Sequence, residues 1–450
     1  ITRQAAYFEL RLLLAGSMDA IAPEISTMTS AIVRVDRAMP RIVRMSPIAA
    51  FLITAALTSA ATFAQDAGAG VQLPDGEPKA FIEGACQACH RLDYIPNARG
   101  FSEDGWRDLI GTMIALPGDL RESVVGYLAE NFPKKPGTDP VLVSGSADVT
   151  ISEWLAPTLG SRPHDPAPGA DGSIWWAGQF ANRIGHVDTA TGETREFPLE
   201  IPNSGPHGLV EDGGGNVWFT GNYEAYLGKL DPRTGDVTDY RLPEGVHHPH
   251  TPIVDDEGTV WFTTMSGHVG KLAPSTEEME ISTAPSDEAF PYGIQINSKG
   301  EPWYVDFWGN RLGSVDPVSG EITEYEMPHA DSRPRRIALT PDDAVWYTDF
   351  PRGYLGRFDP ETGEYREWLS PSGESSQPYG IATIGNVVWY VETYPRPNAL
   401  VRFDTETETF QSWPIPSGGG VVRNMLATED GKLVLACSAV NRVALVEIGT

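Results

Sequence analysis

A tryptophan marker that recurs at nearly constant spacing constrains the fold of this chain more than any other feature. Its positions are Trp175, Trp218, Trp261, Trp303, Trp346 and Trp389, with Leu433-Val434 in the seventh copy. The steps between copies are 43, 43, 42, 43, 43 and 45 residues. One four-stranded propeller blade has this length. The pattern therefore predicts an all-β seven-bladed β-propeller over residues 147–450.

The seventh copy predicts how the ring closes. Copies one to six each contain four strand-like segments, but the seventh ends at Ala444–Glu447, its third strand. The segment Ile151–Pro157, at the start of the repeat region, has the pattern of a last strand. We expect it to complete the seventh blade, because that pairing leaves no exposed sheet edge.

The blade sequence resembles the streptogramin lyase (virginiamycin B lyase) family. The resemblance is carried by Gly205–Gly208 (Gly-Pro-His-Gly), Val217–Thr220 (Val-Trp-Phe-Thr) and Leu355–Gly363 (Leu-Gly-Arg-Phe-Asp-Pro-Glu-Thr-Gly). It extends over the repeats and implies the same seven-bladed fold. It also implies a carbon–oxygen lyase as one candidate activity, although such blade motifs specify a fold more strongly than an activity.

Two positions in each blade are predicted to meet at one mouth of the central channel. The start of the innermost strand gives His164, His207, His250, Tyr292, Arg335, Tyr379 and Arg423. The end of the second strand gives Gly178, Gly221, Thr264, Asp306, Asp349, Glu392 and Cys437. Clustered polar side chains at a channel mouth predict a ligand site. The alternative is that they fill the channel with ion pairs, such as Arg335 with Asp349 or Asp306.

The same ring contains possible metal ligands. Three histidines are a chemically competent metal-binding set, but we expect histidines on adjacent blades to be too far apart. The lyase resemblance implies a histidine base and a magnesium ion held by a carboxylate and a histidine. These roles fall on Tyr379, Arg335 and Glu392. Only the carboxylate matches, because Arg cannot bind a cation and a tyrosine of pKa about 10 is a poor base at neutral pH. We therefore expect streptogramin opening by that mechanism to be lost.

The N-terminal part of the chain predicts export. Residues 39–64 combine a basic start, an uncharged apolar run and small residues before a cut after Ala64, which is typical of a secretory signal peptide. The alternative is a membrane anchor, but the apolar run Pro47–Ala61 is short for a span of about 20 residues. Residues 1–38 precede this complete signal, and we expect them to be an over-extended start. The mature chain is expected to be periplasmic or otherwise exported, without a membrane span.

Residues 79–133 carry the signature of a small all-α cytochrome c-like haem domain. The motif Cys86–His90 (Cys-Gln-Ala-Cys-His) places two thiols on one helical turn, where Cys86 and Cys89 can bind one haem c covalently and His90 can be its proximal ligand. The alternatives are a helix with two structural cysteines or half of a zinc site. A structural zinc site needs four ligands, and the third cysteine, Cys437, is far away in sequence. Met113 is our predicted distal iron ligand; the alternative is a core methionine.

The helical segment also resembles short cytochrome c domains. The matching residues are Arg99, Phe101-Ser102, Trp106, Met113, Tyr127–Ala129 and Phe132-Pro133. This resemblance implies a redox carrier. Residues 134–146 are rich in Pro, Gly and Ser and predict a linker.

Charge limits the partners of the chain. Asp and Glu number 61 against 33 Lys and Arg, giving a net charge of −28. Such a chain repels phosphate backbones, so we expect no nucleic-acid partner. We expect a monomer that binds a small molecule or a redox protein. The favoured function is an exported haem c protein for electron transfer, with an oxidoreductase as the expected enzyme class. The alternatives are a lyase or hydrolase with a rearranged site, and a non-catalytic docking propeller.

Overall fold

The computed structural model describes residues 71–88, 91–98 and 100–449. The predicted signal peptide 39–64, the preceding residues 1–38, and Cys89, His90 and Arg99 lie outside the described residues. The chain divides into two compact units after Leu73, and all described helices and strands belong to the unit that begins at Pro74.

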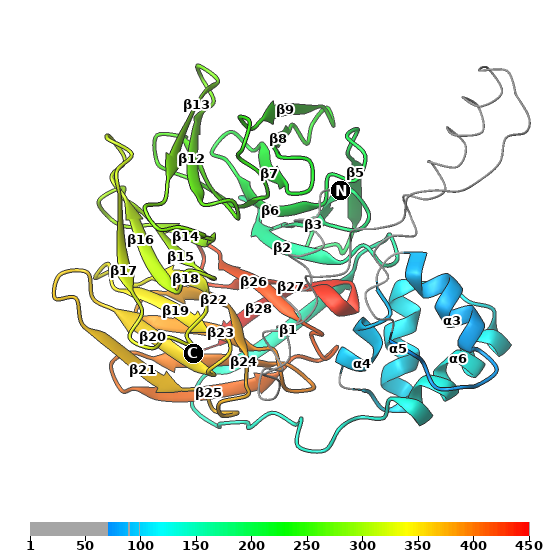
Figure 1. Ribbon diagram of the computed structural model, residues 1–450. Helices are drawn as coiled ribbons and strands as arrows, with labels where there is room; N and C mark the ends of the chain where they lie inside the picture. The colour runs from blue at the N-terminus through cyan, green and yellow to red at the C-terminus, as the bar shows by residue number, and fades with distance from the viewer. Residues whose placement is uncertain (1–70, 89–90, 99, 450) are drawn as a thin grey trace, which may run out of the picture. The chain divides into compact units, whose positions relative to one another are not determined.

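The helical segment forms where the sequence predicts it. Its elements are α3 (Lys79–Ala85), the 3-10 turn η1 (Cys86–Ala88), α4 (Tyr94–Asn97), α5 (Glu103–Met113) and α6 (Gly118–Asn131), coloured blue to cyan in Figure 1. Helix α5 begins at an N-cap, Ser102, whose hydroxyl accepts a hydrogen bond from the Gly105 amide at 3.1 Å. Helices α5 and α6 pack together and bury Trp106 and Val125. Among the described helices, none has both the length and the apolarity needed to cross a membrane.

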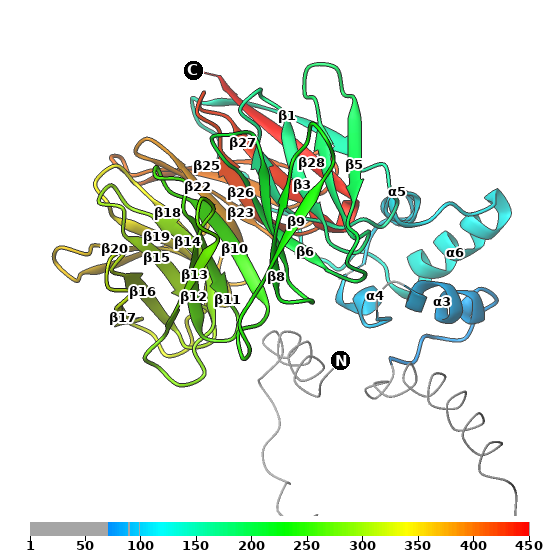
Figure 2. The same ribbon diagram turned by 90° about the horizontal axis from the view of Figure 1, so that it is seen from above.

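Seven four-stranded antiparallel sheets follow, arranged around a common centre (Figures 1 and 2). Blade one contains β2 (Pro163–Pro168), β3 (Ile174–Gly178), β4 (Arg183–Val187) and β5 (Thr194–Pro198). Blade two contains β6 (Pro206–Glu211), β7 (Val217–Gly221), β8 (Tyr226–Leu230) and β9 (Val237–Arg241). Blade three contains β10 (Pro249–Val254), β11 (Val260–Thr264), β12 (His268–Ala273) and β13 (Glu278–Thr283).

The remaining blades repeat this order. Blade four contains β14 (Pro291–Ile296), β15 (Pro302–Asp306), β16 (Arg311–Val315) and β17 (Ile322–Glu326). Blade five contains β18 (Pro334–Leu339), β19 (Val345–Asp349), β20 (Tyr354–Phe358) and β21 (Tyr365–Leu369). Blade six contains β22 (Pro378–Ile384), β23 (Val387–Glu392), β24 (Ala399–Asp404) and β25 (Thr409–Pro414). Blade seven contains β26 (Val422–Ala427), β27 (Leu433–Cys437), β28 (Arg442–Gly449) and β1 (Asp148–Leu155).

Closure by the N-terminal strand is confirmed. Strand β1 pairs antiparallel with β28 from Asp148 opposite Gly449 to Leu155 opposite Arg442. The predicted linker is itself bound to blade six, since the Val143 amide donates to Ser412 Oγ at 2.8 Å and the Ser412 amide donates to the Val143 carbonyl at 2.9 Å. Both ends of the repeat region are therefore held in blade seven, where β1 covers the edge of β28 that would otherwise be unpaired.

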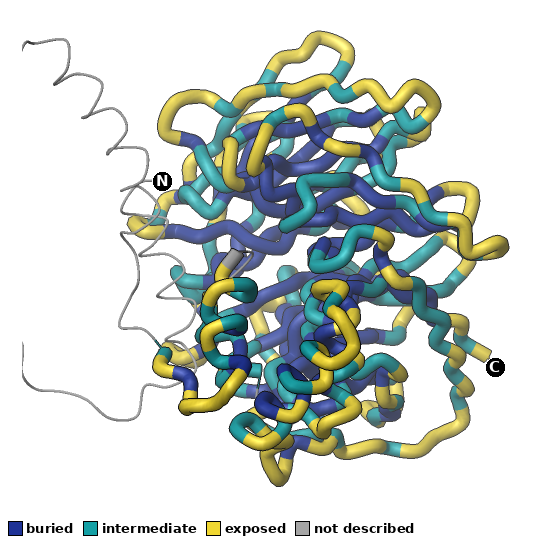
Figure 3. Tube along the Cα trace, turned by 90° about the vertical axis from the view of Figure 1, so that its right-hand side faces the viewer, coloured by how far each residue is buried: buried dark blue, intermediate teal, exposed yellow. Residues whose placement is uncertain are grey.

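The repeat motif has a local physical cause. In the third strand of blades one to five, a glycine lies against an aromatic ring of the second strand: a Cβ on Gly228 would lie 2.1 Å from Phe219, and one on Gly356 would lie 2.0 Å from Tyr347. The marker tryptophans are buried, as Trp218 and Trp389 show at 1% exposure each. In Figure 3 the strands are largely buried and the loops exposed. These contacts bury the blade cores and leave the innermost strands to line the channel.

Candidate functional site

A β-bulge in every innermost strand shapes the channel. In all seven blades the register between the first and second strands shifts just after the start of the innermost strand, as between Pro163 and Pro166 in blade one. A bulge adds a residue and breaks the alternation of side chains. Two successive residues of a blade, such as His164 and Asp165, can therefore both face the channel.

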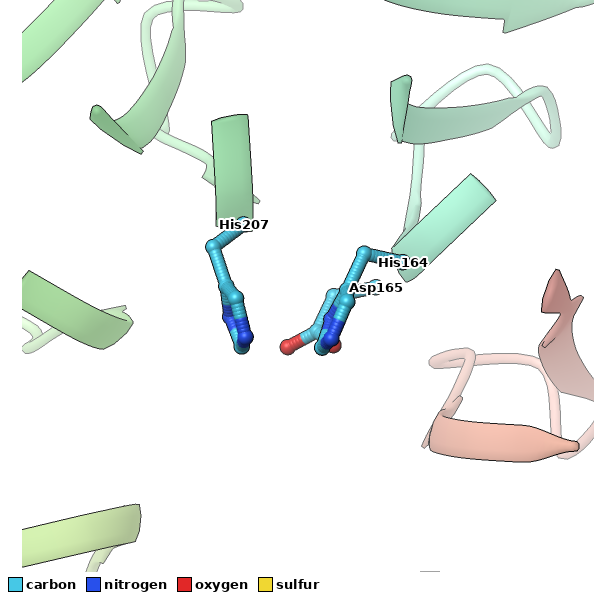
Figure 4. A group of neighbouring side chains, drawn as sticks. All are labelled: His164, Asp165 and His207. Atoms are coloured by element: carbon cyan, nitrogen blue, oxygen red, sulfur yellow. The ribbon is translucent and has the colours of Figure 1, made fainter. Parts of the chain in front are cut away.

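The first of these positions forms the predicted ring, hereafter the first ring: His164, His207, His250, Tyr292, Arg335, Tyr379 and Arg423. Its histidine rings are in contact and tilted to one another, with centroids 3.5 Å apart for His164 and His207 and 4.0 Å apart for His207 and His250; the tilted Tyr292 ring lies 3.6 Å from His250. Figure 4 shows His164 and His207 entering the same space from neighbouring strands. The expectation that histidines of adjacent blades are too far apart to meet is wrong, because the innermost strands converge at the channel axis.

The other side of the first ring is a tyrosine–arginine cluster. Tyr379 Oη lies 2.6 Å from Tyr292 Oη and accepts a hydrogen bond from Arg335 Nη1 at 3.1 Å. Burial raises the pKa of Tyr379, but the positive charge of Arg335, with Arg423 and Arg336, outweighs burial and lowers this pKa to about 8. Burial and the neighbouring Tyr379 raise the pKa of Tyr292. Tyr292 therefore keeps its proton and donates to Tyr379, which favours the Tyr379 phenolate.

Several buried polar atoms of the first ring have no hydrogen-bond partner within the described residues. They are His207 Nδ1, His250 Nε2, Arg335 Nε and Arg423 Nε. Neither Arg335 nor Arg423 forms an ion pair with a carboxylate in the described part of the chain. Burial, followed by neighbouring positive charge, lowers the pKa of the histidines well below its ordinary value, so they are neutral at pH 7. The ring thus combines two guanidiniums that lack a carboxylate partner among the described residues, one of them bonded to Tyr379, with donors and acceptors that lack partners.

The predicted second ring behaves differently. Its carboxylates bond to loops between strands: Asp306 Oδ1 accepts from the Phe290 amide at 2.8 Å and Glu392 Oε1 from the Ser372 amide at 2.8 Å. Asp349 pairs with Arg352 at 2.8 Å, not with Arg335 as the ion-pair alternative had it. Burial raises the pKa of Asp306 to about 6 and that of Glu392 to about 7. These carboxylates therefore have loop partners, and a role for Glu392 at the channel mouth stays a prediction.

The second channel-facing position forms a layer that the sequence analysis missed. Its residues are Asp165, Gly208, Thr251, Gly293, Arg336, Gly380 and Asn424. Arg336 Nη2 donates to both oxygens of Asp165 at 2.8 and 3.0 Å, and Asn424 Nδ2 donates to Asp165 at 3.0 Å. Arg336 Nη1 also donates to Thr251 Oγ1 at 2.9 Å. We call Asp165, Thr251, Arg336 and Asn424 the plug, because they join blades one, three, five and seven across the channel.

The plug has a readable sequence signal. The position after each first-ring residue alternates polar residues with glycine around the ring, as in Asp165, Gly208, Thr251, Gly293 and Arg336. The glycines leave space for neighbouring backbone: a Cβ on Gly208 would lie 2.4 Å from the His250 carbonyl oxygen. The plug also orients the first ring, because the His164 Nδ1 atom lies 2.8 Å from Asp165 and that of His250 lies 2.8 Å from Thr251 Oγ1.

The observed contacts show whether either group of candidate metal ligands could hold a metal ion. His164, Asp165 and His207 each offer a ligand atom within 4.8 Å of the others. However, the Asp165 carboxylate already accepts hydrogen bonds from Arg336 and Asn424, and a guanidinium at that distance repels a cation. At the positions that the lyase resemblance assigns to magnesium, Arg335 is a cation and Glu392 is bonded to Ser372. Neither set fits Mg²⁺, which prefers oxygen ligands.

The predicted haem residues lie in the helical segment. Cys86 begins η1, directly after α3, whose Ile82 is fully buried. Met113 is the last residue of α5, and its side chain, 37% exposed, adjoins Ile114, which is 39% exposed. Cys86 and Met113 therefore stay predicted haem residues, while the remaining motif residues Cys89 and His90 lie outside the described residues.

Comparison with known proteins agrees with this architecture. Residues 144–383, just over half of the chain, match the model of the Virginiamycin B lyase family, and the chain belongs to that family. A solved streptogramin B lyase structure is similar with a TM-score of 0.61 at 23% identity, covering 67% of this chain and 98% of that one. Selenomethionine-substituted virginiamycin B lyase from Staphylococcus aureus gives 0.60 at 23% identity, covering 66% and 99%.

A more distant structure has the same fold. Kuenenia stuttgartiensis hydrazine synthase gives a TM-score of 0.52 at 13% identity, covering 63% of this chain and 95% of that chain. No curated protein matches the chain. At these identities the likeness to the solved structures concerns the propeller fold, which hosts many activities.

Proposed function

We propose that this protein is an exported c-type haem protein whose propeller binds a small anionic molecule at the first ring and exchanges electrons with it. The observation that carries the electron-transfer half is the Cys86–His90 motif at the end of α3, joined in one chain to the propeller. The haem would supply one-electron chemistry when bound. Cys86 and Cys89 would hold it covalently, and His90 and Met113 would be the ligands of its iron.

The first ring supports an anionic ligand on charge and hydrogen bonding. Arg335 is a buried cation and Arg423 a half-buried one; neither has a carboxylate partner among the described residues, and a buried cation without a full countercharge is costly. An anion between them would offset that cost and accept hydrogen bonds from their free Nε atoms. Tyr379, with its pKa lowered to about 8, is suited to give or take a proton beside the bound molecule near neutral pH.

The first experiment addresses the haem. A haem stain and visible spectrum of the periplasmic fraction should show covalent haem, and Cys86→Ala/Cys89→Ala should leave a folded propeller without it. Met113→Ala should remove the weak near-infrared band of methionine ligation, while Met425→Leu, in the propeller, should keep it. Haem that leaves the denatured wild-type protein in acidic organic solvent would contradict covalent attachment.

The second experiment addresses the ring. Small carboxylates and inorganic oxyanions are screened for reduction or oxidation of the haem and for binding by calorimetry. Arg335→Met should abolish binding of any hit, while the exposed Arg233→Met should not. Binding that survives Arg335→Met would place the ligand elsewhere.

A lyase with a rearranged site is a second candidate, and one observation favours it. Tyr379, at the position of the family's base, has a lowered pKa of about 8. As phenolate it could remove a proton from carbon; the electron pair would form a carbon–carbon double bond as the carbon–oxygen bond breaks. The leaving oxygen would then take a proton. Turnover of an ester or lactone that persists in Cys86→Ala/Cys89→Ala and stops in Tyr379→Phe would favour this candidate over the haem-linked one.

A further inference from the structure

Three histidines of the first ring form one contact cluster at the channel axis. His164, His207 and His250 lie at the starts of β2, β6 and β10, and none is more than 5% exposed. His207 lies between the other two, with its ring centroid 3.5 Å from that of His164 and 4.0 Å from that of His250. Figure 4 shows His164 and His207 side by side, both extending in the same direction from neighbouring strands. Three buried imidazoles therefore share one small space.

The plug orients two of these imidazoles through one ring nitrogen each. His164 Nδ1 lies 2.8 Å from the Asp165 carboxylate, and His250 Nδ1 lies 2.8 Å from Thr251 Oγ1. A carboxylate only accepts, so His164 Nδ1 carries the proton and Nε2 keeps its lone pair. Metal-binding histidines are commonly fixed in this way, by a hydrogen bond from the other ring nitrogen to a carboxylate or similar acceptor. The contacts of the plug are therefore those expected around metal ligands.

Two nitrogens of the cluster have no hydrogen-bond partner within the described residues. They are His207 Nδ1 and His250 Nε2, and both atoms are buried. Burial favours the neutral form of an imidazole, which is the form that binds metal ions. A buried polar atom left without a partner destabilises the folded state. An ion that accepted lone pairs from this cluster would offset that cost.

The spacing of the nitrogens is close to what a shared ion requires. One ligand atom of His164 and one of His207 lie within 4.8 Å of each other. Two imidazoles that bind one zinc ion at about 2.0–2.1 Å have their nitrogens roughly 3.3 Å apart. The rings of neighbouring histidines are tilted by 38° and 51°. A rotation of each ring about its Cβ–Cγ bond changes this spacing without moving the strands.

The charges around the cluster decide which ion it suits. Arg336 donates to both oxygens of Asp165, so each balances the charge of the other and Asp165 is not needed as a ligand. Arg335 bonds to Tyr379, and the half-buried Arg423 keeps its charge. This charge disfavours a hard cation such as Mg²⁺, which also prefers oxygen ligands. Imidazole ligands instead suit zinc and copper.

We propose that His164, His207 and His250 bind one late first-row transition-metal ion, zinc or copper, through three imidazole nitrogens. His207 is the central ligand, because it contacts both of the others. Three protein ligands leave one coordination position for a water molecule or another small ligand. This site requires neither the haem nor the anion proposed above, and it can be tested without them.

The first measurement uses the full-length protein, dialysed against a chelator that leaves covalently held haem in place. Calorimetric titration with Zn²⁺ should show one tightly bound equivalent. Cu²⁺ should displace it, because copper binds nitrogen ligands more tightly than zinc does. X-ray absorption at the zinc edge, where haem iron does not interfere, should show three imidazoles at about 2.0–2.1 Å.

Three histidine variants locate the ion. His207→Gln removes the central ligand and should weaken Zn²⁺ binding by more than the roughly 10–100-fold that loss of an outer-shell partner costs. His250→Gln replaces it if His207→Gln does not fold, and melting temperatures are recorded for each variant. His247→Gln is the matched control, because His247 is half-buried and lies three residues before His250 but outside the first ring. It should leave the Kd for Zn²⁺ unchanged.

Several results would overturn the proposal. They are no tightly bound equivalent of Zn²⁺ or Cu²⁺, a zinc ion surrounded by oxygen ligands, or equal effects of His207→Gln and His247→Gln. Zinc binding that survives His207→Gln and is lost in Cys86→Ala/Cys89→Ala would assign the ion to the cysteine motif instead. Absence of haem or failure of the anion screen would leave the expected zinc result unchanged, so this proposal and the proposed function fail separately.

Discussion

The two ends of the channel are built from the same seven strands and yet have opposite chemistry. At the first ring, the buried Arg335 and the half-buried Arg423 have no carboxylate partner in the described part of the chain, and they lie beside three neutral histidines and two tyrosines. At the other end, a cavity of about 830 Å³ has a rim with acidic residues such as Asp171, Glu211 and Glu429. Between them, the plug pairs Asp165 with Arg336 and separates the two regions.

This difference teaches how a repeat fold diversifies. Blades one to five keep the same glycine and aromatic residue in their cores, and all seven blades keep the same four-stranded antiparallel sheet. The channel positions carry no part of that packing and can change independently. The bulge then places two consecutive residues of each strand in the channel. A single strand can therefore contribute a ring residue and a plug residue at consecutive positions, as Arg335 and Arg336 do.

Breaking the plug should cause the largest loss in the free energy of unfolding. Asp165→Asn leaves Arg336 as a buried cation without a countercharge, and we expect a loss of about 3–5 kcal/mol in the free energy of unfolding. Denaturant unfolding of the wild type and the variant measures it. Arg366→Gln, which breaks the surface pair with Glu408, should cost less than about 1 kcal/mol. Equal losses in both variants would mean that the plug is no more important than a surface ion pair.

Removing the ring cation should change the acidity of Tyr379. Arg335→Met removes the largest favourable charge, so the pKa of Tyr379 should rise from about 8 by roughly 1–3 units. Titration at 295 nm, with Tyr379→Phe subtracted to isolate this phenol, follows the change. The exposed Arg233→Met provides the matched control and should leave the titration unchanged. A Tyr379 that titrates normally in the wild type would contradict the cluster described above.

The buried Glu392, whose carboxylate accepts hydrogen bonds from the Ser372 loop, should make stability depend on pH. Burial raises its pKa from 4.5 to about 7, so the folded state binds more protons than the unfolded state between those values. Stability should therefore fall as pH rises from 4.5 to 7, with Glu392 contributing about 2 kcal/mol of that loss. Glu392→Gln keeps the bonds to Ser372 and should remove this part. Melting curves from pH 4.5 to 8 for both proteins measure it; parallel pH profiles would argue against the assignment.

The smallest effect is expected when a charge is removed at the mouth opposite the first ring. Glu429→Gln removes one rim charge in contact with water, and the plug separates that charge from the first ring. We expect the pKa of Tyr379 to move by less than about 0.3 unit at 0.15 M salt, and the free energy of unfolding by less than about 0.5 kcal/mol. The 295 nm titration used for Arg335→Met is the measurement. A shift as large as that of Arg335→Met would show that the plug does not insulate the two ends.

The candidate site was only partly predictable. The first ring could be located because each member occupies a fixed place in its repeat. The orientation of Glu392 and Asp306 could not, because a strand end can turn towards the channel or towards the neighbouring loop, and only the loop backbone decides. The acidity of Tyr379 was also out of reach, because it depends on Arg335 and Tyr292 from two other blades.

The sequence by itself determined the number of blades, the N-terminal strand that completes the seventh and the haem motif at Cys86–His90. Each of these rests on residues close together in the chain or on a repeated spacing. Tertiary structure decided what the channel does. Arg336 meets Asp165 across 171 positions of sequence, and Tyr379 meets Tyr292 across 87. Such contacts form only when the ring closes, because closure alone brings the start of every innermost strand to one axis.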